Sequence, residues 1–210
     1  MQRVLIIGSS RGLGLGLLDA HLEQGWEVHA TTRDGSAARH HSWLTPHRLD
    51  VRDDAQLATL VGDLAEPMDR VIHNAGINHA PRKDLFEVNT DAPIRVVQTL
   101  LDAGVVTEGG LVAILSSIAG SRGSRPGSLG DYGDSKAALN DEFRRRVDDW
   151  NAAGASAIVV HPGWVRTDMG GPSARVGLDE SVAGMMRVFE SITPADHGRF
   201  LDWERKELPW

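Results

Sequence analysis

Tyr132 and Lys136 lie four residues apart, and their side chains form the pair in this sequence that points most directly to chemistry. If the segment around them opens a helix, this spacing places the phenol and the ammonium on one face. An ammonium beside a phenol favours the phenolate and lowers a phenol pKa that starts near ~10. Such a phenol can exchange a proton with an alcohol or carbonyl oxygen at neutral pH. The same spacing occurs by chance at ordinary helix starts. Whether this pair is catalytic therefore depends on the motifs in the rest of the chain.

The composition excludes several classes of protein. The chain has 210 residues, 41% hydrophobic and 24% charged, which suits one globular domain, so we expect a single domain over residues 1–210. A net charge of -7, from 22 basic and 29 acidic residues, argues against nucleic acid or an anionic membrane as a partner. The absence of cysteine excludes disulfides, and the apolar run at 4–7 is too short for a signal peptide, so we expect a cytoplasmic protein. The spacing of His40, His41 and His47 does not suit a metal site, so we predict none.

Apolar runs of strand length alternate with segments of helical period. The predicted strands are 4–8, 27–31, 48–51, 70–73, 111–116, 157–161 and 199–203. The predicted helices are 13–23, 55–64, 85–101, 136–150 and 180–189. This alternation predicts a doubly wound α/β Rossmann fold, with about seven parallel strands and helices on both faces. Ligands bind such sheets at the carboxyl ends of the strands, where we expect the irregular stretches 35–43, 78–83, 121–130 and 170–177.

A glycine-rich loop follows the first predicted strand. Its residues with a predicted cofactor contact are Gly8, Ser10, Arg11, Gly12, Leu13 and Gly14. The glycines are spaced as GxxxGxG, and they let the backbone turn sharply and approach a pyrophosphate at the following helix N-terminus. Because the loop lies between the first strand and the first helix, it predicts a nucleotide-binding site.

The end of the second predicted strand distinguishes between two nucleotide cofactors. An NAD-binding domain usually has Asp or Glu there to bind the ribose 2′-hydroxyl, but this chain has Thr32 and Arg33. An arginine suits a 2′-phosphate, which a carboxylate would repel. Arg11 is placed to reach the same phosphate. The residues favour NADP(H), while Asp34, one position further on, leaves NAD(H) possible.

Further motifs appear in a fixed order along the chain. They are Asp50-Val51, Asn74-Ala75-Gly76, Asn89, Ser117, Tyr132-x3-Lys136 and Pro162-Gly163. With the glycine loop, these motifs resemble the short-chain dehydrogenase/reductase family from residue 4 to the end of the sequence. The segments 135–140 and 161–172, together with the final residues 198–210, are most similar to the C-factor and Sniffer-type carbonyl reductase branch.

The resemblance implies a role for each matching residue. Asn89 would hold a water that relays protons, Ser117 would bind the substrate oxygen, Tyr132 would be the acid/base, and Lys136 would bind the nicotinamide ribose and lower the tyrosine pKa. The other implied cofactor ligands are Asp50, Val51, Asn74, Ala75, Gly76, Pro162, Gly163, Val165 and Thr167.

These features predict an NADP(H)-dependent oxidoreductase that interconverts a small carbonyl compound and its alcohol. The alternative is a non-catalytic NAD(P)-binding signalling or regulatory protein of the C-factor type. The short stretch after Thr167 predicts an open and undiscriminating pocket. The helix after Tyr132 has one apolar stripe, and its other faces are charged, so we expect a monomer or a weak homodimer.

Overall fold

The computed structural model describes residues 1–124 and 130–210, in which strands and helices alternate. The strands are β1 (Arg3–Ile7), β2 (Glu27–Thr32), β3 (Leu44–Arg48), β4 (Met68–His73), β5 (Val106–Leu115), β6 (Ser156–His161) and β7 (Phe200–Asp202). The α-helices are α1 (Gly12–Glu23), α2 (Asp54–Asp63), α3 (Arg82–Phe86), α4 (Ala92–Asp102), α5 (Gly130–Ala152) and α6 (Leu178–Ser191). Shorter helical segments are the π-helical η1 (Glu87–Asp91) and the 3-10 turns η2 (Ile118–Gly120) and η3 (Pro194–Asp196).

The strands form one parallel seven-stranded sheet in the order β3-β2-β1-β4-β5-β6-β7. The chain builds outward from β1 to β3, then returns and adds β4 on the other side of β1. Between β1 and β4 the direction of the winding reverses, and this is the point where open α/β sheets bind their ligands. The predicted doubly wound α/β fold is confirmed.

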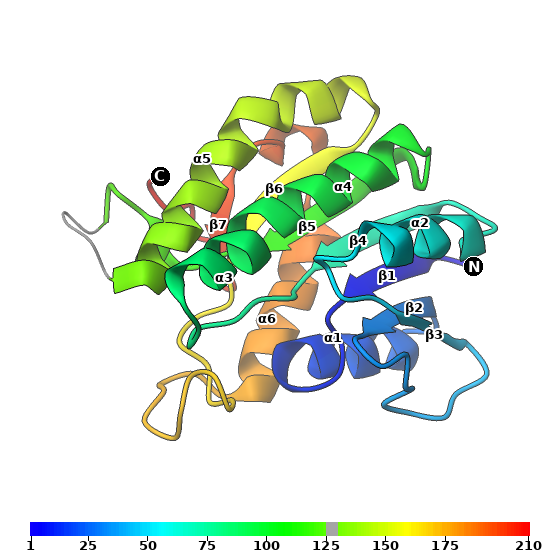
Figure 1. Cartoon of the computed structure of the whole chain (residues 1–210), viewed down its shortest axis with the longest axis horizontal. Coiled ribbons are helices and arrows are strands. Elements are labelled where there is room, and N and C mark those ends of the chain that lie inside the picture. The colour runs from blue at the N-terminus through cyan, green and yellow to red at the C-terminus, as the bar shows by residue number, and fades with distance from the viewer. Residues whose placement is uncertain (125–129) are drawn as a thin grey trace.

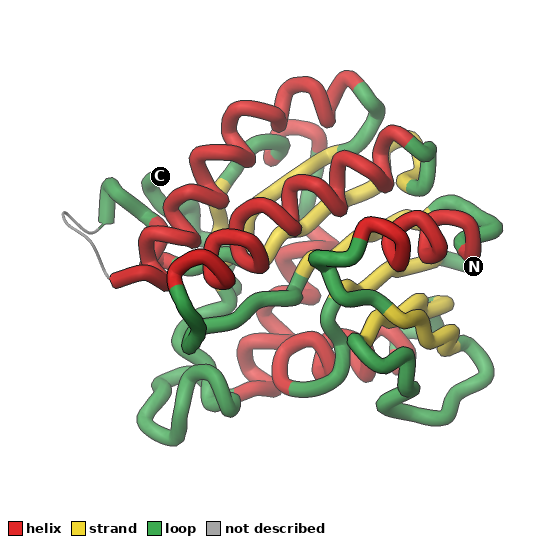
Figure 2. The backbone as a smooth tube through the Cα atoms, viewed as in Figure 1, coloured by secondary structure: helices red, strands yellow, loops and turns green. Residues whose placement is uncertain are grey.

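Helices cover both faces of the sheet. In Figure 1, α2, α4 and α5 lie over one face, while α1 and α6 lie over the other. Figure 2 shows the strands enclosed between these layers. Successive residues of β1 divide between two cores, because Leu5 and Ile7 pack under α2, α4 and α5, whereas Val4 and Ile6 pack against α1 and α6. Burial on both faces explains why the strands are almost continuously apolar.

The third strand lies earlier than the sequence predicted. It spans Leu44–Arg48 and not 48–51, so Asp50 and Val51 follow the strand. The sequence pattern missed it because Pro46 lacks an N–H and interrupts the apolar run. At the sheet edge, where β3 lies, a proline is tolerated since one side of the strand has no partner.

The helix predicted over 85–101 is divided into α3, η1 and α4, and Asn89 lies in its π-helical part. The helix predicted over 136–150 begins earlier, at Gly130, so it includes Tyr132. The irregular stretch predicted at 121–130 is described only to Ser124 and again from Gly130 onward, and residues 125–129 lie outside the described residues. None of the described helices is both long enough and apolar enough to cross a membrane.

Candidate active site

The first turns of α5 carry Tyr132 and Lys136. Because α5 begins at Gly130, the two side chains lie one helical turn apart on the same face. Lys136 is buried, and its ammonium donates to the carbonyl oxygen of Leu115 at 3.0 Å. This bond ties the helix to the carboxyl end of β5, in the middle of the sheet. Burial lowers the pKa of Lys136 to about 8, so the side chain changes charge at mildly alkaline pH.

The Tyr132 phenol behaves differently from the sequence-based expectation. Burial raises the pKa of Tyr132 above its ordinary value, and a hydrogen bond with the Ser117 hydroxyl offsets part of this rise. The net shift of the Tyr132 pKa is therefore upward, opposite to the direction expected from the Lys136 ammonium taken alone. Spacing along a helix places two groups on one face, but it contains no information on desolvation, which opposes the phenolate.

Two serines follow β5, and only one of them is bonded to the phenol. The buried Ser116 hydroxyl donates to Asn140 Oδ1 at 2.7 Å. The Ser117 hydroxyl accepts the N–H of Ala119 at 3.1 Å and hydrogen-bonds with Tyr132. The structure thus places Ser117 beside the proposed acid/base, while Ser116 supports the helix behind it.

Asn89 is fully buried in η1, and its side chain is held by several hydrogen bonds. Its Oδ1 accepts the N–H of Ile77 at 2.9 Å, and its Nδ2 donates to the Ile77 carbonyl and to Ser135 Oγ, at 2.8 and 3.1 Å. A Cβ at Gly76 would lie 3.2 Å from Asn89 Oδ1 and 3.7 Å from Lys136 Nζ. These two polar atoms therefore border the same small space beside Gly76. π-Helical segments of this kind are rare and occur often at functional sites.

Ser135 connects η1 to the turn of α5 between Tyr132 and Lys136. Its hydroxyl donates to the Tyr132 carbonyl at 2.7 Å and accepts from Asn89. Its own carbonyl accepts the Thr90 hydroxyl at 2.7 Å. Ser135 cannot be recognised from the sequence, because a serine inside a helix carries no distinctive signal. It fixes the backbone that orients the tyrosine and the lysine.

The glycine loop fits closely against the end of β4. Gly8 has a φ of +86°, and a Cβ there would lie 2.8 Å from Ala75 Cα. A Cβ at Gly14 would lie 2.0 Å from the Gly8 carbonyl oxygen, which accepts from Asn74 Nδ2 at 2.5 Å. Helix α1 then begins with neither a side-chain cap nor an acidic residue in its first turn. Its first N–H groups are suited to an anion such as a pyrophosphate.

Beyond β2, Asp34 is engaged in its own turn. It accepts hydrogen bonds from the Ser36 hydroxyl at 2.7 Å, the Ser36 N–H at 3.1 Å and the Thr32 hydroxyl at 3.0 Å. These bonds lower the pKa of Asp34 to about 2. Arg33 is exposed and forms no hydrogen bond or ion pair with the residues that the structure describes. The end of β2 thus presents a cation to the cleft, as a 2′-phosphate requires.

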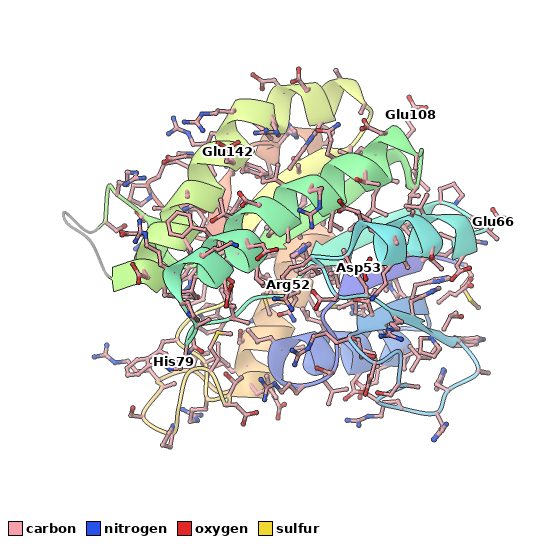
Figure 3. All side chains as sticks on the ribbon, viewed as in Figure 1. Arg52, Asp53, Glu66, His79, Glu108 and Glu142 are labelled. Atoms are coloured by element: carbon pink, nitrogen blue, oxygen red, sulfur yellow. The ribbon has the colours of Figure 1, made fainter. Side chains whose placement is uncertain are left out.

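Asp50, the predicted adenine contact, is bound to Arg52. The carboxylate accepts from Arg52 Nε at 3.1 Å and from a terminal guanidinium nitrogen at 2.8 Å. These hydrogen bonds lower the pKa of Asp50. Arg33, Arg48, Asp50 and Arg52 line one exposed hollow beside β3, and Figure 3 labels Arg52 there. The sequence did not predict Arg48 and Arg52 as site residues, because arginines scattered over about twenty positions resemble ordinary surface residues.

The segment after β6 approaches the glycine loop from the opposite side. A Cβ at Gly12 would lie 3.5 Å from the Thr167 methyl group. Arg11 pairs with Asp168 at 3.0 Å, and the two side chains are 75% and 76% exposed. Asn78 Nδ2 donates to the Met169 carbonyl at 3.0 Å. Arg11 is therefore paired across the cleft in this structure, although an exposed pair of this kind is weak and a phosphate can compete for it.

These elements enclose a cleft of about 830 Å³. The predicted site residues that line it are Gly8, Ser10, Arg11, Gly12, Leu13, Thr32, Arg33, Asp50, Val51, Asn74, Ala75, Gly76, Tyr132, Lys136, Pro162 and Thr167. The predicted residues that are not among those lining the cleft are Gly14, Asn89, Ser117, Gly163 and Val165, whereas Ser116, the neighbour of Ser117, lines it. His79, labelled in Figure 3, also lines the cleft and was not predicted.

A dinucleotide fits the residues of this cleft. The loop positions where a Cβ would collide are glycines, the α1 N-terminus is uncapped, and a free arginine follows β2. Each of these features suits a phosphate group of such a ligand. The described residues contain no cluster of three or more His, Asp or Glu side chains placed to hold a metal ion.

Known proteins resemble this chain in sequence and in fold. The description of the family whose model matches residues 2–175 is short chain dehydrogenase. C-signal of Myxococcus xanthus is 36% identical over 157 residues, which are 69% of this chain and 93% of that protein. The NADPH-bound carbonyl reductase from chicken fatty liver is 30% identical with a TM-score of 0.89, over 100% of this chain and 94% of that one. Carbonyl reductase Sniffer of D. melanogaster is 27% identical with a TM-score of 0.88, over 100% of both chains.

The family match extends from β1 to the segment after β6, and it includes both the glycine loop and the Tyr132–Lys136 pair. The full-length structural matches extend the similarity through β7. Sequence, topology and cleft agree with one another: this chain belongs to the short-chain dehydrogenase/reductase family, in the branch that contains carbonyl reductases and C-signal.

Proposed function

We propose that this protein reversibly reduces a carbonyl compound to its alcohol with NADPH, and that Tyr132 is the general acid/base. Family membership makes the chain an oxidoreductase, and NADP(H) is its preferred cofactor. The observation that carries the proposal is that Tyr132 and Lys136 line the same cleft as the glycine loop. Such a cleft holds a proton donor and a dinucleotide together.

In the proposed mechanism, the glycine loop, the α1 N-terminus and Arg33 would hold NADPH, which would supply the hydride for the carbonyl carbon. The Ser117 hydroxyl donates to the carbonyl oxygen and holds it beside Tyr132, with which Ser117 is already hydrogen-bonded. As the C=O π bond breaks, its electron pair moves to that oxygen, and the Tyr132 phenol gives the oxygen its proton. The Lys136 ammonium stabilises the phenolate that remains. Asn89 and Lys136 border one space beside Gly76, through which we propose that a water returns the proton.

The cofactor preference follows from the charges at the end of β2. Arg33 is free to bind a 2′-phosphate, while the Asp34 carboxylate already accepts hydrogen bonds from Ser36 and Thr32. A phosphate gains charge-assisted hydrogen bonds from a guanidinium, whereas a 2′-hydroxyl gains much less. The chicken carbonyl reductase, with a similar fold, was solved with NADPH bound.

A second candidate function is non-catalytic signalling. It is favoured by the 36% identity to C-signal, whose match spans 93% of that protein. A signalling role would need the cofactor cleft for stability or regulation, and it would leave the arrangement of Tyr132, Ser117 and Lys136 unused. We therefore rank carbonyl reduction first.

We further propose that the protein works in the cytoplasm as a single domain and as a monomer or weak dimer. The apolar stripe of α5 faces its own core, since Leu139, Phe143, Val147 and Trp150 are all buried. The remaining faces are largely charged, whereas obligate interfaces are mostly apolar. Light scattering that found a stable tetramer at low micromolar concentration would refute this.

The test of the proposed function is a turnover screen. Purified protein is offered aldehydes, quinones, diketones and steroid ketones with NADPH and, separately, with NADH. We expect oxidation of NADPH by at least one class of carbonyl, at a higher kcat/KM than with NADH. Tight NADPH binding without turnover of any carbonyl would instead favour the signalling function, and a preference for NADH would contradict the cofactor assignment.

A further inference from the structure

His73, the last residue of β4, has a buried imidazole with no evident role. Its side chain is 1% exposed, and neither ring nitrogen has a hydrogen-bond partner among the described residues. Buried polar atoms in folded proteins are nearly always paired, with protein groups or with ordered water. An imidazole with two unpaired nitrogens in the centre of the sheet therefore calls for a partner.

The position of His73 shows where that partner must lie. Side chains alternate along a strand: Val71 belongs to the core under α4 and α5, and Ile72 to the opposite core. His73 consequently faces the layer of α4 and α5. Its neighbours across the sheet are Ile7 on β1 and Ile114 on β5, neither of which has a polar side chain. The partner must come from the helices above the strand.

Lys136 is the charged group whose electrostatic effect acts on His73. Its ammonium is bonded to the carbonyl of Leu115, the residue that follows the strand neighbour of His73. Burial, and then the positive charge of Lys136, lower the pKa of His73 to about 3, while the backbone of His73 itself opposes this shift. The imidazole is therefore neutral, with one nitrogen that accepts a hydrogen bond and one that donates. Tyr132 is the other titratable group on this part of α5, and β1 and β5 add none beside His73.

The Lys136 ammonium has N–H groups beyond the one that bonds to Leu115. A lysine ammonium carries three N–H groups, and the Leu115 carbonyl takes one of them. Another part of the ammonium borders the space shared with Asn89 beside Gly76, three residues after His73. No direct bond joins His73 to Lys136 within the described residues, and a single buried water can accept from the ammonium and donate to the imidazole.

We propose that His73 is a positioning residue for proton transfer, whose neutral imidazole accepts a hydrogen bond from the Lys136 ammonium through one buried water and keeps that lysine charged. The role deepens the proposed function and rests on it, because Lys136 acts there by stabilising the Tyr132 phenolate. An acceptor on the ammonium favours the charged form and opposes the desolvation that burial imposes.

The direct test is a titration of Lys136 by NMR in protein labelled at the lysine ε-carbon. The lysines of this chain are Lys83, Lys136 and Lys206, and only Lys136 is buried, so its resonance is distinct. His73→Met and His73→Gln form a matched pair of similar length, of which only Gln can hold a water. We expect His73→Met to lower the Lys136 pKa by about one unit and His73→Gln to leave it near the wild-type value.

One control, one replacement variant and one activity measurement make the result specific. His29→Met removes another buried histidine of the sheet and should leave the Lys136 titration unchanged. If His73→Met does not unfold cooperatively, His73→Leu is titrated in its place. In carbonyl reduction, the alkaline limb of kcat should move to lower pH in His73→Met, with the KM for NADPH unchanged.

A Lys136 pKa that is the same in wild type, His73→Met and His73→Leu would overturn the proposal, as would an equal fall in His73→Gln. The titration needs no turnover, so it decides the role of His73 even if no carbonyl is reduced. If carbonyls are reduced and the Lys136 pKa does not move, the inference about His73 fails while the proposed function stands.

Discussion

The two ends of the cleft are built in different ways. At the proton-transfer end, buried side chains bond across elements: Lys136 of α5 reaches β5, and Asn89 of η1 reaches Ser135 of α5. At the adenosine end, side chains at the surface bond within their own turns, as Asp34 does with Ser36 and the half-buried Asp50 with Arg52. The fold therefore holds the proton-transfer side chains in fixed positions. The side chains that select the cofactor remain in contact with water, where salt screens their charges. Substitutions should have large effects at the first end and graded effects at the second.

The largest effect in this comparison is expected from Lys136→Met. The variant removes the ammonium while it keeps most of the buried volume, so carbonyl reduction should fall about 10²- to 10⁴-fold in kcat. The measurement is NADPH oxidation at saturating carbonyl. Lys206→Met is the matched control, because Lys206 is exposed and lies outside the cleft.

The same lysine predicts a pH dependence. Burial lowers the pKa of Lys136 to about 8, and only the charged form stabilises the phenolate. The wild-type kcat for carbonyl reduction should therefore fall as the pH rises through about 8. Two results would contradict the large effect expected at the proton-transfer end of the cleft. One is a wild-type kcat that stays constant to pH 10, and the other is a Lys136→Met variant with full turnover.

An intermediate effect is expected from Arg33→Asp at the adenosine end. The substitution replaces the cation by a charge that repels a 2′-phosphate, so kcat/KM for NADPH should fall about 10- to 100-fold, and that for NADH should change little. The loss should shrink at high ionic strength, because the group is exposed. Arg187→Asp, on the exposed face of α6, is the control. An unchanged ratio of NADPH to NADH activity would show that Arg33 does not bind the phosphate.

The smallest effect is expected from Asp34→Ala. Since Asp34 bonds to Ser36 and Thr32, its loss should alter a surface turn and leave kcat/KM for NADH within about twofold of wild type. The measurement is the steady-state rate with NADH over a range of concentrations. A tenfold fall would mean that Asp34 leaves its turn to bind the ribose, and it would reopen the assignment of NAD as the weaker cofactor.

The sequence predicted those parts of the fold and site that depend on local order. The GxxxGxG loop follows β1, and Tyr132 and Lys136 share one face of α5, because both patterns depend on neighbouring residues. The third strand was misplaced because Pro46 hides an edge strand. The helix over 85–101 was predicted as continuous, since no residue pattern marks the π-helical segment at Asn89.

Long-range packing explains what the sequence did not predict. The sign of the Tyr132 pKa shift was wrong because burial is set by the residues around the phenol, not by the lysine four positions away. Nothing in the sequence distinguishes His73 from an ordinary strand residue. Only the assembled sheet shows that its imidazole is buried and subject to the charge of Lys136. Likewise, only the bond between Arg52 and Asp50 in the folded structure connects Arg52 to the candidate site.

The central claim is that Tyr132 gives its proton to the substrate oxygen, and Tyr132→Phe tests it most directly. Phenylalanine keeps the ring and removes only the hydroxyl of the single tyrosine in the chain. With NADPH binding first shown to be intact by fluorescence, we expect kcat for carbonyl reduction to fall about 10²- to 10⁴-fold. A Tyr132→Phe protein that binds NADPH and reduces the same carbonyl at the wild-type rate would contradict the account.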